Sequence, residues 1–176
     1  MEKNLKKSRT YDIVETGLMA AVIFIVTYLF HLPSHFGTVH LGDGMVLLSA
    51  AILSRKKAVA ASSISMFLFD VASGYMIWSP FTLVIKGVMA YLASVLYEKY
   101  KNVFAFIPAV LWMIAGYYLT GAIIYKFFTS TESYTFIRGL QASLLDIPTN
   151  IVQGTAGLIT AAIFIKALEN FKIKRG

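Results

Sequence analysis

The sequence predicts an all-α membrane protein with six transmembrane helices and both termini in the cytoplasm. Hydrophobic residues make up 57% of the chain and charged residues 14%, whereas a soluble domain carries about 25% charged residues. The apolar runs reach the length of about 20 residues that crosses a bilayer. Lysine and arginine fall in short clusters between these runs, as the positive-inside rule describes. We expect residues 1–176 to form a single six-helix membrane domain.

The composition also excludes several kinds of chemistry. The chain has no cysteine, so it has no disulfide, thiolate metal site or thiol nucleophile. The net charge of +7 does not indicate a nucleic-acid partner, because the basic residues follow the ends of the apolar runs. No Walker A sequence is present, so the chain does not hydrolyse ATP by that chemistry. We expect neither an enzyme nor a bound cofactor or metal.

The first helix is expected at residues 11–30, after a basic amino terminus. Its apolar run is longer than that of a signal peptide, and no A-x-A-like cleavage site follows, so we expect it to be retained. Gly17 and Ala21 form a small-x-x-x-small pair with Ala20 beside them. Such a ridge permits close approach of another helix, either within the bundle or from a partner subunit.

The remaining chain reads as five further helices with alternating turns. The segment 31–40 contains Pro33, Gly37 and three histidines and is predicted to be an outer loop. Arg55-Lys56-Lys57 marks a cytoplasmic turn, and Pro80 suits the first turn of a helix. Residues 129–138 are expected to form a polar outer loop. The helices are expected at 41–53, 58–73, 80–97, 103–128 and 142–168.

The distribution of basic residues fixes the predicted orientation. Of the 16 lysine and arginine residues, all but Lys86, Lys126 and Arg138 lie at the amino terminus, at the second and fourth turns, or at the carboxy-terminal end. Those positions share one side of a six-helix chain, so this side is predicted to be cytoplasmic.

Four ionisable residues lie within or beside the apolar helices: Asp43, Asp70, Lys86 and Asp146. Charges in spanning segments cost several kcal/mol and normally face a partner or a wet cavity. At about 1.5 Å per helical residue, all four fall in the outer half, which predicts a shared, outward-facing polar cavity. Each has a structural alternative. Asp70 and Lys86 are candidates for an ion pair between neighbouring helices, and Asp43 and Asp146 for helix caps.

Other polar and aromatic residues surround this predicted cavity. Asn150 and Gln153 share a helix face and could present donors and acceptors to a heterocycle, or bond neighbouring helices. Trp78 could stack on a ligand or anchor the chain at the interface. His40 adjoins the start of a helix and is a ligand candidate, whereas His31 and His35 are expected to be solvated. Tyr75 carries the same two alternatives as Trp78.

Glycines accompany these polar residues. Gly42 and Gly44 flank Asp43 and are expected to let the loop turn into the bundle and the backbone approach a ligand. Gly154 and Gly157 follow Gln153 and are expected to allow close helix packing.

Three motifs carry a resemblance to a known family. V-H-L-G-D-G before the second helix, W-S-P-F-T-L-V-I-K-G in the fourth and N-I-V-Q-G in the sixth resemble the substrate-binding S-components of energy-coupling factor (ECF) vitamin transporters. The similarity covers nearly all of the chain and is strongest to the branch for riboflavin, hydroxymethylpyrimidine or pyridoxine.

The resemblance implies a subunit of a bacterial plasma-membrane ABC importer. Such proteins bind a vitamin at the outer face, with the first loop as a lid. They associate with a membrane scaffold (T) subunit and two cytoplasmic ATPase subunits, and topple in the bilayer to release the vitamin inside. The small-residue motif of the first helix contacts the scaffold in the family, and Gly17 and Ala21, with Ala20, match it here.

The residues of the predicted cavity favour a small neutral or weakly basic heterocycle, of which pyridoxine and hydroxymethylpyrimidine are examples. Riboflavin, pantothenate and folate are alternative vitamins. A structural membrane protein, an intramembrane enzyme and a stand-alone secondary transporter are alternative classes. The expected substrate-binding residues are His40, Asp43, Asp70, Trp78, Lys86, Asp146, Asn150 and Gln153.

Overall fold

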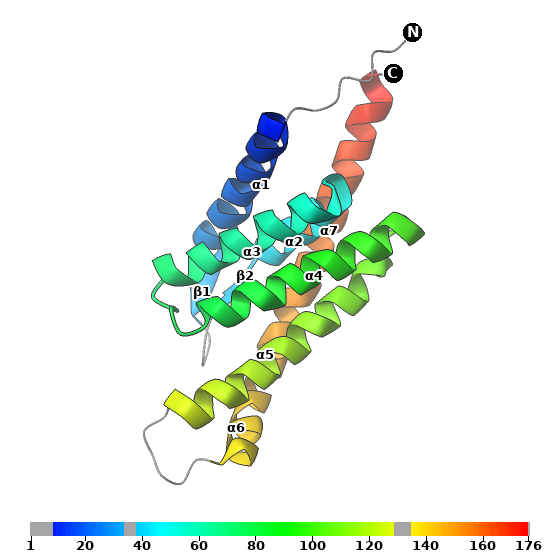
Figure 1. Cartoon of the computed structure of the whole chain (residues 1–176). Helices are drawn as coiled ribbons and strands as arrows, with labels where there is room; N and C mark the ends of the chain where they lie inside the picture. Colours follow the sequence, from blue (N-terminus) through cyan, green and yellow to red (C-terminus); the bar gives the residue numbers. More distant parts are fainter. Residues whose placement is uncertain (1–8, 34–37, 129–134, 176) are drawn as a thin grey trace.

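The computed structural model describes residues 9–33, 38–128 and 135–175, and within them the chain is almost entirely helical (Figure 1). One short antiparallel hairpin separates the first two helices. The elements are α1 (Arg9–Leu29), β1 (His31–Pro33), β2 (Thr38–His40), α2 (Gly42–Ile52), α3 (Arg55–Ala72), α4 (Ser79–Tyr100), η1 (Val103–Phe106), α5 (Ile107–Phe128), α6 (Phe136–Ser143), η2 (Leu144–Asp146) and α7 (Ile147–Arg175).

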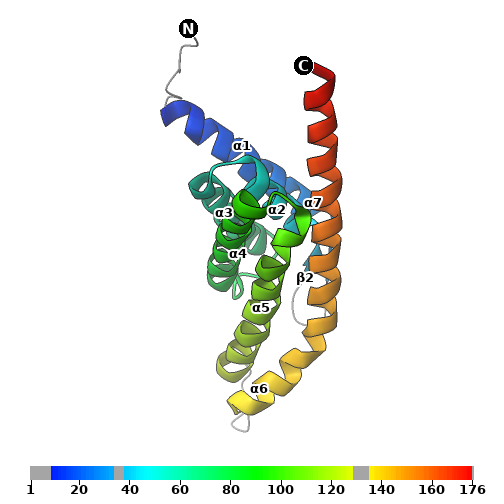
Figure 2. The same ribbon diagram turned by 90° about the vertical axis from the view of Figure 1, so that its right-hand side faces the viewer.

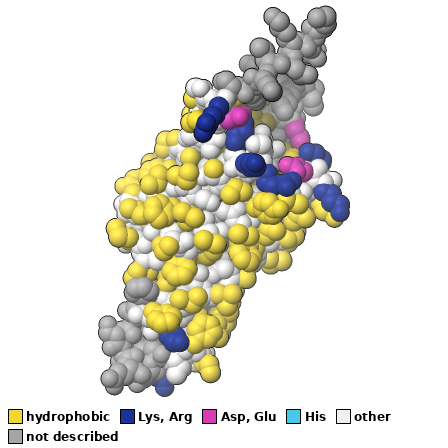
Figure 3. All heavy atoms as spheres, in the orientation of Figure 1, with side chains coloured by type: hydrophobic (Ala, Val, Ile, Leu, Met, Phe, Trp, Pro, Cys, Tyr) yellow, Lys and Arg dark blue, Asp and Glu magenta, His cyan; other side chains and the backbone are white. Residues whose placement is uncertain are grey.

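The helices form a bundle with two distinct ends. The start of α1, the end of α7 and the α2–α3 and α4–α5 connections lie toward one end, at the top of Figure 1. The hairpin, the α3–α4 turn and α6 lie toward the other end. Figure 3 shows the described lysine, arginine, aspartate and glutamate side chains of that face concentrated at the first end, with hydrophobic side chains over the middle. We call these the charged end and the hairpin end.

Four described helical stretches are long and apolar enough to cross a membrane. The helix α2 is apolar but has only 11 residues. Nine consecutive residues of it, from Gly42 to Ala50, are buried, because α1, α3, α4 and α7 all pack against it. A helix that is apolar on all sides is stable only inside such a bundle. The four long stretches are Arg9–Leu29, Ser79–Tyr100, Val103–Phe127 and Phe136–Phe171.

Glycines set the closeness of α2 to its neighbours. A Cβ atom on Gly44 would lie 2.6 Å from the Thr160 side chain, and one on Gly157 would lie 3.0 Å from Cβ of Asp43. The first distance is too short for a real Cβ and the second is tight enough that a neighbour would have to shift, so α2 and α7 approach each other closely here. Gly154 likewise faces Val110, at 2.4 Å from a built Cβ. The expected close packing at Gly154 and Gly157 is therefore confirmed.

The structure corrects several predicted boundaries. The segment predicted as a loop contains the hairpin, in which His31 pairs with His40 and Leu32 with Val39. The predicted cytoplasmic turn Arg55-Lys56-Lys57 is the first turn of α3, since its long side chains can extend outward without leaving helical geometry. Its first residue, Arg55, still directly follows the α2–α3 connection.

The last predicted helix is interrupted. Residues 136–143 form α6, residues 144–146 a 3₁₀ turn, and α7 continues beyond 168 to Arg175. Pro148 lies in the first turn of α7, where the missing amide hydrogen costs nothing, so the break precedes it. The turn before α4 agrees with the prediction: Gly74 has φ +85° and Pro80 lies in the first turn of α4. Residues 129–134 of the predicted outer loop lie outside the described residues.

Candidate ligand-binding site

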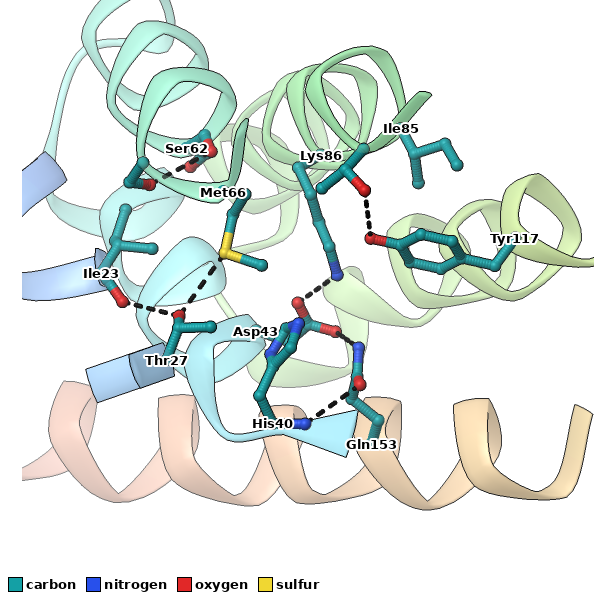
Figure 4. A network of polar contacts seen from close by, with 12 residues as sticks. Ile23, Thr27, His40, Asp43, Ser62, Met66, Ile85, Lys86, Tyr117 and Gln153 are labelled. Atoms are coloured by element: carbon teal, nitrogen blue, oxygen red, sulfur yellow. Dashed lines mark hydrogen bonds and ion pairs between the residues drawn. The ribbon is translucent and has the colours of Figure 1, made fainter. Parts of the chain in front are cut away.

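A buried ion pair between α2 and α4 forms the centre of the polar region (Figure 4). The ammonium of Lys86 donates a hydrogen bond to Oδ1 of Asp43, and neither side chain is exposed at all. Burying two charges is costly unless each is paired and further hydrogen-bonded. The two groups therefore stabilise each other and fix the register of α2 against α4.

Gln153 extends this pair to α7 and to the hairpin. Its Nε2 donates to Oδ2 of Asp43 at 2.8 Å, and its Oε1 accepts from the backbone amide of His40 at 3.2 Å. The side chain is 2% exposed. Both carboxylate oxygens of Asp43 are thus satisfied, and Gln153 makes the interhelical bonds that the sequence left as one alternative.

Tyr117 of α5 is a member of the polar region that the sequence did not single out. The Lys86 ammonium lies 5.1 Å from the centre of its ring, within cation–π range. The Tyr117 hydroxyl donates to Oγ1 of Thr82 at 3.5 Å. The spacing of Thr82 and Lys86 places both on one face of α4, but nothing in the apolar run of α5 marked Tyr117 among its other aromatic residues.

Asp70 lies near this chain of contacts but does not pair with Lys86. Lys86 bonds Asp43 instead, so the structure does not contain the Asp70–Lys86 ion pair that the sequence left as one alternative. Asp70 is 4% exposed. Its Oδ2 has no hydrogen-bond partner among the residues that the structure describes. Asp70 thus lies close to the Asp43–Lys86 pair with one buried carboxyl oxygen unbonded.

The two described histidines pack edge-on against Phe69 of α3. The ring centroids lie 5.4 Å from it for His31 and 5.6 Å for His40. His31 also contacts the Tyr28 carbonyl oxygen through Nδ1 at 2.7 Å and is partly buried, so it is not the solvated residue we expected. Burial lowers the pKa of His40, in the hairpin, to about 4, so its imidazole is neutral near pH 7. His35 lies outside the described residues.

The other predicted site residues lie on α7 and in the segments that precede α4 and α7. The Trp78 ring is 6.1 Å from that of Tyr117, at the start of α4. Asn150 is partly buried, one turn before Gln153 on α7. Asp146 ends the 3₁₀ turn before α7, and its carbonyl oxygen accepts from Oγ1 of Thr149 at 2.7 Å. Tyr75 is partly buried, and its amide donates to the Asp70 carbonyl oxygen at 2.8 Å, which closes the end of α3.

Two local roles predicted from the sequence are corrected. Asp43 lies in the first turn of α2, but no side chain caps that helix, because its carboxylate is bonded to Lys86 and Gln153. Gly42 and Gly44 are helical rather than turn residues. A Cβ on Gly42 would lie 1.9 Å from Oγ1 of Thr27, so this glycine permits contact between α2 and α1.

Two of the small residues of α1, Gly17 and Ala21, face away from the bundle, whereas Ala20 packs against its core. Gly17 and Ala21 are exposed, and Ala20 is partly buried. A Cβ on Gly17 would meet nothing within 4 Å. Internal packing therefore does not explain Gly17, and the ridge is available to another helix.

A cavity of about 350 Å³ lies near the charged end, away from the polar region. It is mainly apolar, with two glutamates on its wall, one of which (Glu15) is bonded to Lys57 of α3. None of the predicted substrate-binding residues lines it. Its lining residues are Glu15, Ala51, Ile52, Leu53, Tyr97, Ile165, Leu168 and Glu169.

Comparison with known proteins identifies the family. Residues 7–170 match the family described as ECF-type riboflavin transporter, S component. The chain belongs to this S-component family. Its members are membrane-embedded transport subunits for vitamin uptake and are not themselves enzymes. The expected family membership is thus confirmed.

One relative and two solved structures extend this result. The chain is 24% identical to the thiamine precursor transporter HmpT of Lactococcus lactis subsp. cremoris (strain MG1363), covering 99% of this chain and 94% of the relative. It is similar to the S component of a bacterial ECF transporter at a TM-score of 0.67 and 15% identity, covering 93% of this chain and 98% of that one. It is also similar to the S-component for biotin from an ECF-type ABC transporter, at 0.64 and 17%, covering 94% and 95%. These two likenesses support the S-component fold.

Proposed function

We propose that this S-component captures a small heterocyclic vitamin or vitamin precursor at the hairpin end, with hydroxymethylpyrimidine favoured and pyridoxine next. The observation that carries the proposal is the buried polar region of Asp43, Lys86, Gln153, Asp70 and Tyr117. Buried, ionisable groups at membrane depth mark substrate sites more often than structural ones. The HmpT relative supports a thiamine precursor.

The charge balance of the region supports a neutral or weakly basic ligand. Lys86 is bonded to Asp43, so it offers no unshared positive charge to a carboxylate ligand. Pantothenate and folate are anions and would meet the Asp70 carboxylate without a compensating cation. Riboflavin is the second candidate, because the matched family is described as a riboflavin transporter family, and its ring system would need more room than a single pyrimidine.

The proposed topology places the charged end in the cytoplasm and the hairpin end outside. The spans would be α1, α2, α3, α4, α5 and the α6–α7 unit. Described basic residues at the charged end, such as Arg9, Arg55, Lys57 and Lys99, support this orientation. The ligand would then enter from the outer face, with the hairpin as its cover.

Delivery to the cytoplasm would require partner subunits. We propose that a membrane scaffold subunit contacts the ridge of Gly17, Ala20 and Ala21 on α1, of which Gly17 and Ala21 are exposed. Two cytoplasmic ATPases would supply ATP hydrolysis, in the plasma membrane of a bacterium. The exposure of Gly17 and Ala21 supports a contact outside this chain. The toppling of the subunit that the resemblance implies belongs to the same proposal.

Mass spectrometry of small molecules extracted from the purified protein tests the proposal. We expect the extract to contain a pyrimidine or a pyridine. If the buried charges serve only to join helices, the extract will contain no bound heterocycle. Asp43→Asn and Lys86→Ala are expected to weaken binding of that ligand more than tenfold, about 1.4 kcal/mol. Wild-type affinity in both folded variants would refute the assignment of the site.

A further inference from the structure

The Asp70 side chain carries a buried oxygen whose hydrogen bonding is incomplete. Asp70 is only 4% exposed, and its Oδ2 has no hydrogen-bond partner within the described parts of the chain. Buried polar atoms are nearly always bonded, so an orphaned one needs an explanation. An orphaned carboxylate oxygen is a stronger case, because burial penalises the charge as well as the missing bond.

The neighbours of Asp70 do not remove this deficit. Thr82 accepts a hydrogen bond from the Tyr117 hydroxyl, and no hydrogen bond from Thr82 reaches Oδ2 of Asp70. Lys86 is close enough to influence Asp70 electrostatically but bonds Asp43. The amide of Tyr75 bonds the Asp70 backbone carbonyl rather than its side chain. Oδ2 of Asp70 is therefore a buried acceptor to which none of the described residues donates a hydrogen bond.

We infer that Asp70 accepts a hydrogen bond from an N–H group of the ligand and that this contact selects an aminopyrimidine. This inference rests on the proposed function and assigns its substrate chemistry. An exocyclic amino group supplies a donor without a full charge, and a weakly basic ring strengthens the bond to a carboxylate. A carbonyl in the same place would present an acceptor to an acceptor.

The position of Asp70 suits this role. It lies at the end of α3, beside Phe69, whose ring contacts both described histidines of the hairpin. Lys86 and Tyr117 lie close enough to Asp70 to interact with it electrostatically, and the Lys86 ammonium faces the Tyr117 ring. A planar ligand bonded to Asp70 would thus meet aromatic rings and polar groups together, the combination found in small-molecule sites.

A matched ligand pair tests the inference directly. Binding of hydroxymethylpyrimidine and of the analogue with a carbonyl in place of its amino group is measured by isothermal titration on the full chain in detergent. The wild type is expected to prefer the amino compound by at least tenfold, in line with about 1.4 kcal/mol for one bond to a charged group. Asp70→Asn is expected to remove most of this preference, because its amide can turn a donor toward the carbonyl.

Controls separate this contact from general damage. Glu169→Gln makes the same carboxylate-to-amide change at the charged end and is expected to keep the wild-type preference. Circular dichroism and thermal melting establish that each variant is folded, and Asp70→Ser replaces Asp70→Asn where the latter does not fold. For Asp70→Ser, the ratio of the affinities for the amino and the carbonyl compound is measured in the same way.

The outcomes distinguish the inference from the function on which it rests. A folded Asp70 variant with the wild-type preference, or a wild type without preference, overturns the inference while leaving the binding function intact. A wild type that binds riboflavin or pyridoxine but neither pyrimidine also overturns it. A wild type that binds none of these heterocycles overturns the proposed substrate class itself.

Discussion

Lys86→Met should destabilise the protein strongly, and adding Asp43→Asn should restore much of the loss. The ammonium and the carboxylate are both fully buried, so removing the lysine leaves Asp43 with Gln153 as its remaining side-chain bond. Removing one partner of a buried pair costs about 3–5 kcal/mol, whereas replacing both by groups of similar volume is often nearly neutral. Methionine fills most of the volume of the lysine chain, which limits any cavity contribution.

The double variant carries the test. In Asp43→Asn/Lys86→Met no buried charge remains at the pair, and the asparagine oxygen can still accept from Gln153. We expect its free energy of unfolding to lie within about 2 kcal/mol of wild type and above that of Lys86→Met, a favourable coupling of the size seen for contacting residues. Unfolding in a detergent titration, followed by circular dichroism, gives the four free energies of the cycle.

A matched lysine provides the control. Lys126→Met makes the same substitution at an exposed position of α5, where the change should stay within about 0.5 kcal/mol. If Lys86→Met were as stable as wild type, or the double variant less stable than either single one, the pair would not stabilise the fold in the way argued.

Three further predictions concern glycine packing, the α1 ridge and acid sensitivity. Gly157→Val should cost about 1–3 kcal/mol by overpacking, because its Cβ would lie 3.0 Å from that of Asp43; an unchanged melting temperature would contradict this. Gly17→Val, with nothing within 4 Å of its Cβ, should leave the melting temperature unchanged but reduce copurification with a coexpressed scaffold subunit, and full retention of that subunit would count against the docking ridge. The pKa of His40 is lowered by burial from 6.5 to about 4, so between these pH values the unfolded chain binds a proton that the folded protein does not. The free energy of unfolding should therefore decrease as the pH is lowered from about 6.5 to about 4. His40→Gln should show a shallower loss in pH-dependent melting, and an identical slope would refute the assignment.

The helices were largely predictable from local sequence. Apolar runs, basic clusters and turn residues placed α2, α4 and α5 within a few residues, because these signals act over one or two turns. The hairpin was missed, since Pro33 and Gly37 favour any turn equally and strand pairing needs a partner segment. The split of the last helix into α6 and α7 was missed because the residues around Leu144 are apolar on both sides of the break.

The sequence alone determined which charged and amide residues lie in an apolar environment, and therefore most of the residues of the candidate site, although not Tyr117. Hydrophobic length and charge placement are properties of the chain itself, and the family motifs lie in the same order. Only the tertiary structure decided how those residues are paired. Lys86 and Gln153 lie 43 and 110 residues after Asp43 along the chain. No local rule states which carboxylate a buried lysine bonds. That choice follows from the close contact of α2 with α7 at Gly44 and Gly157, which brings Asp43 to Gln153 and leaves Asp70 with an unbonded oxygen.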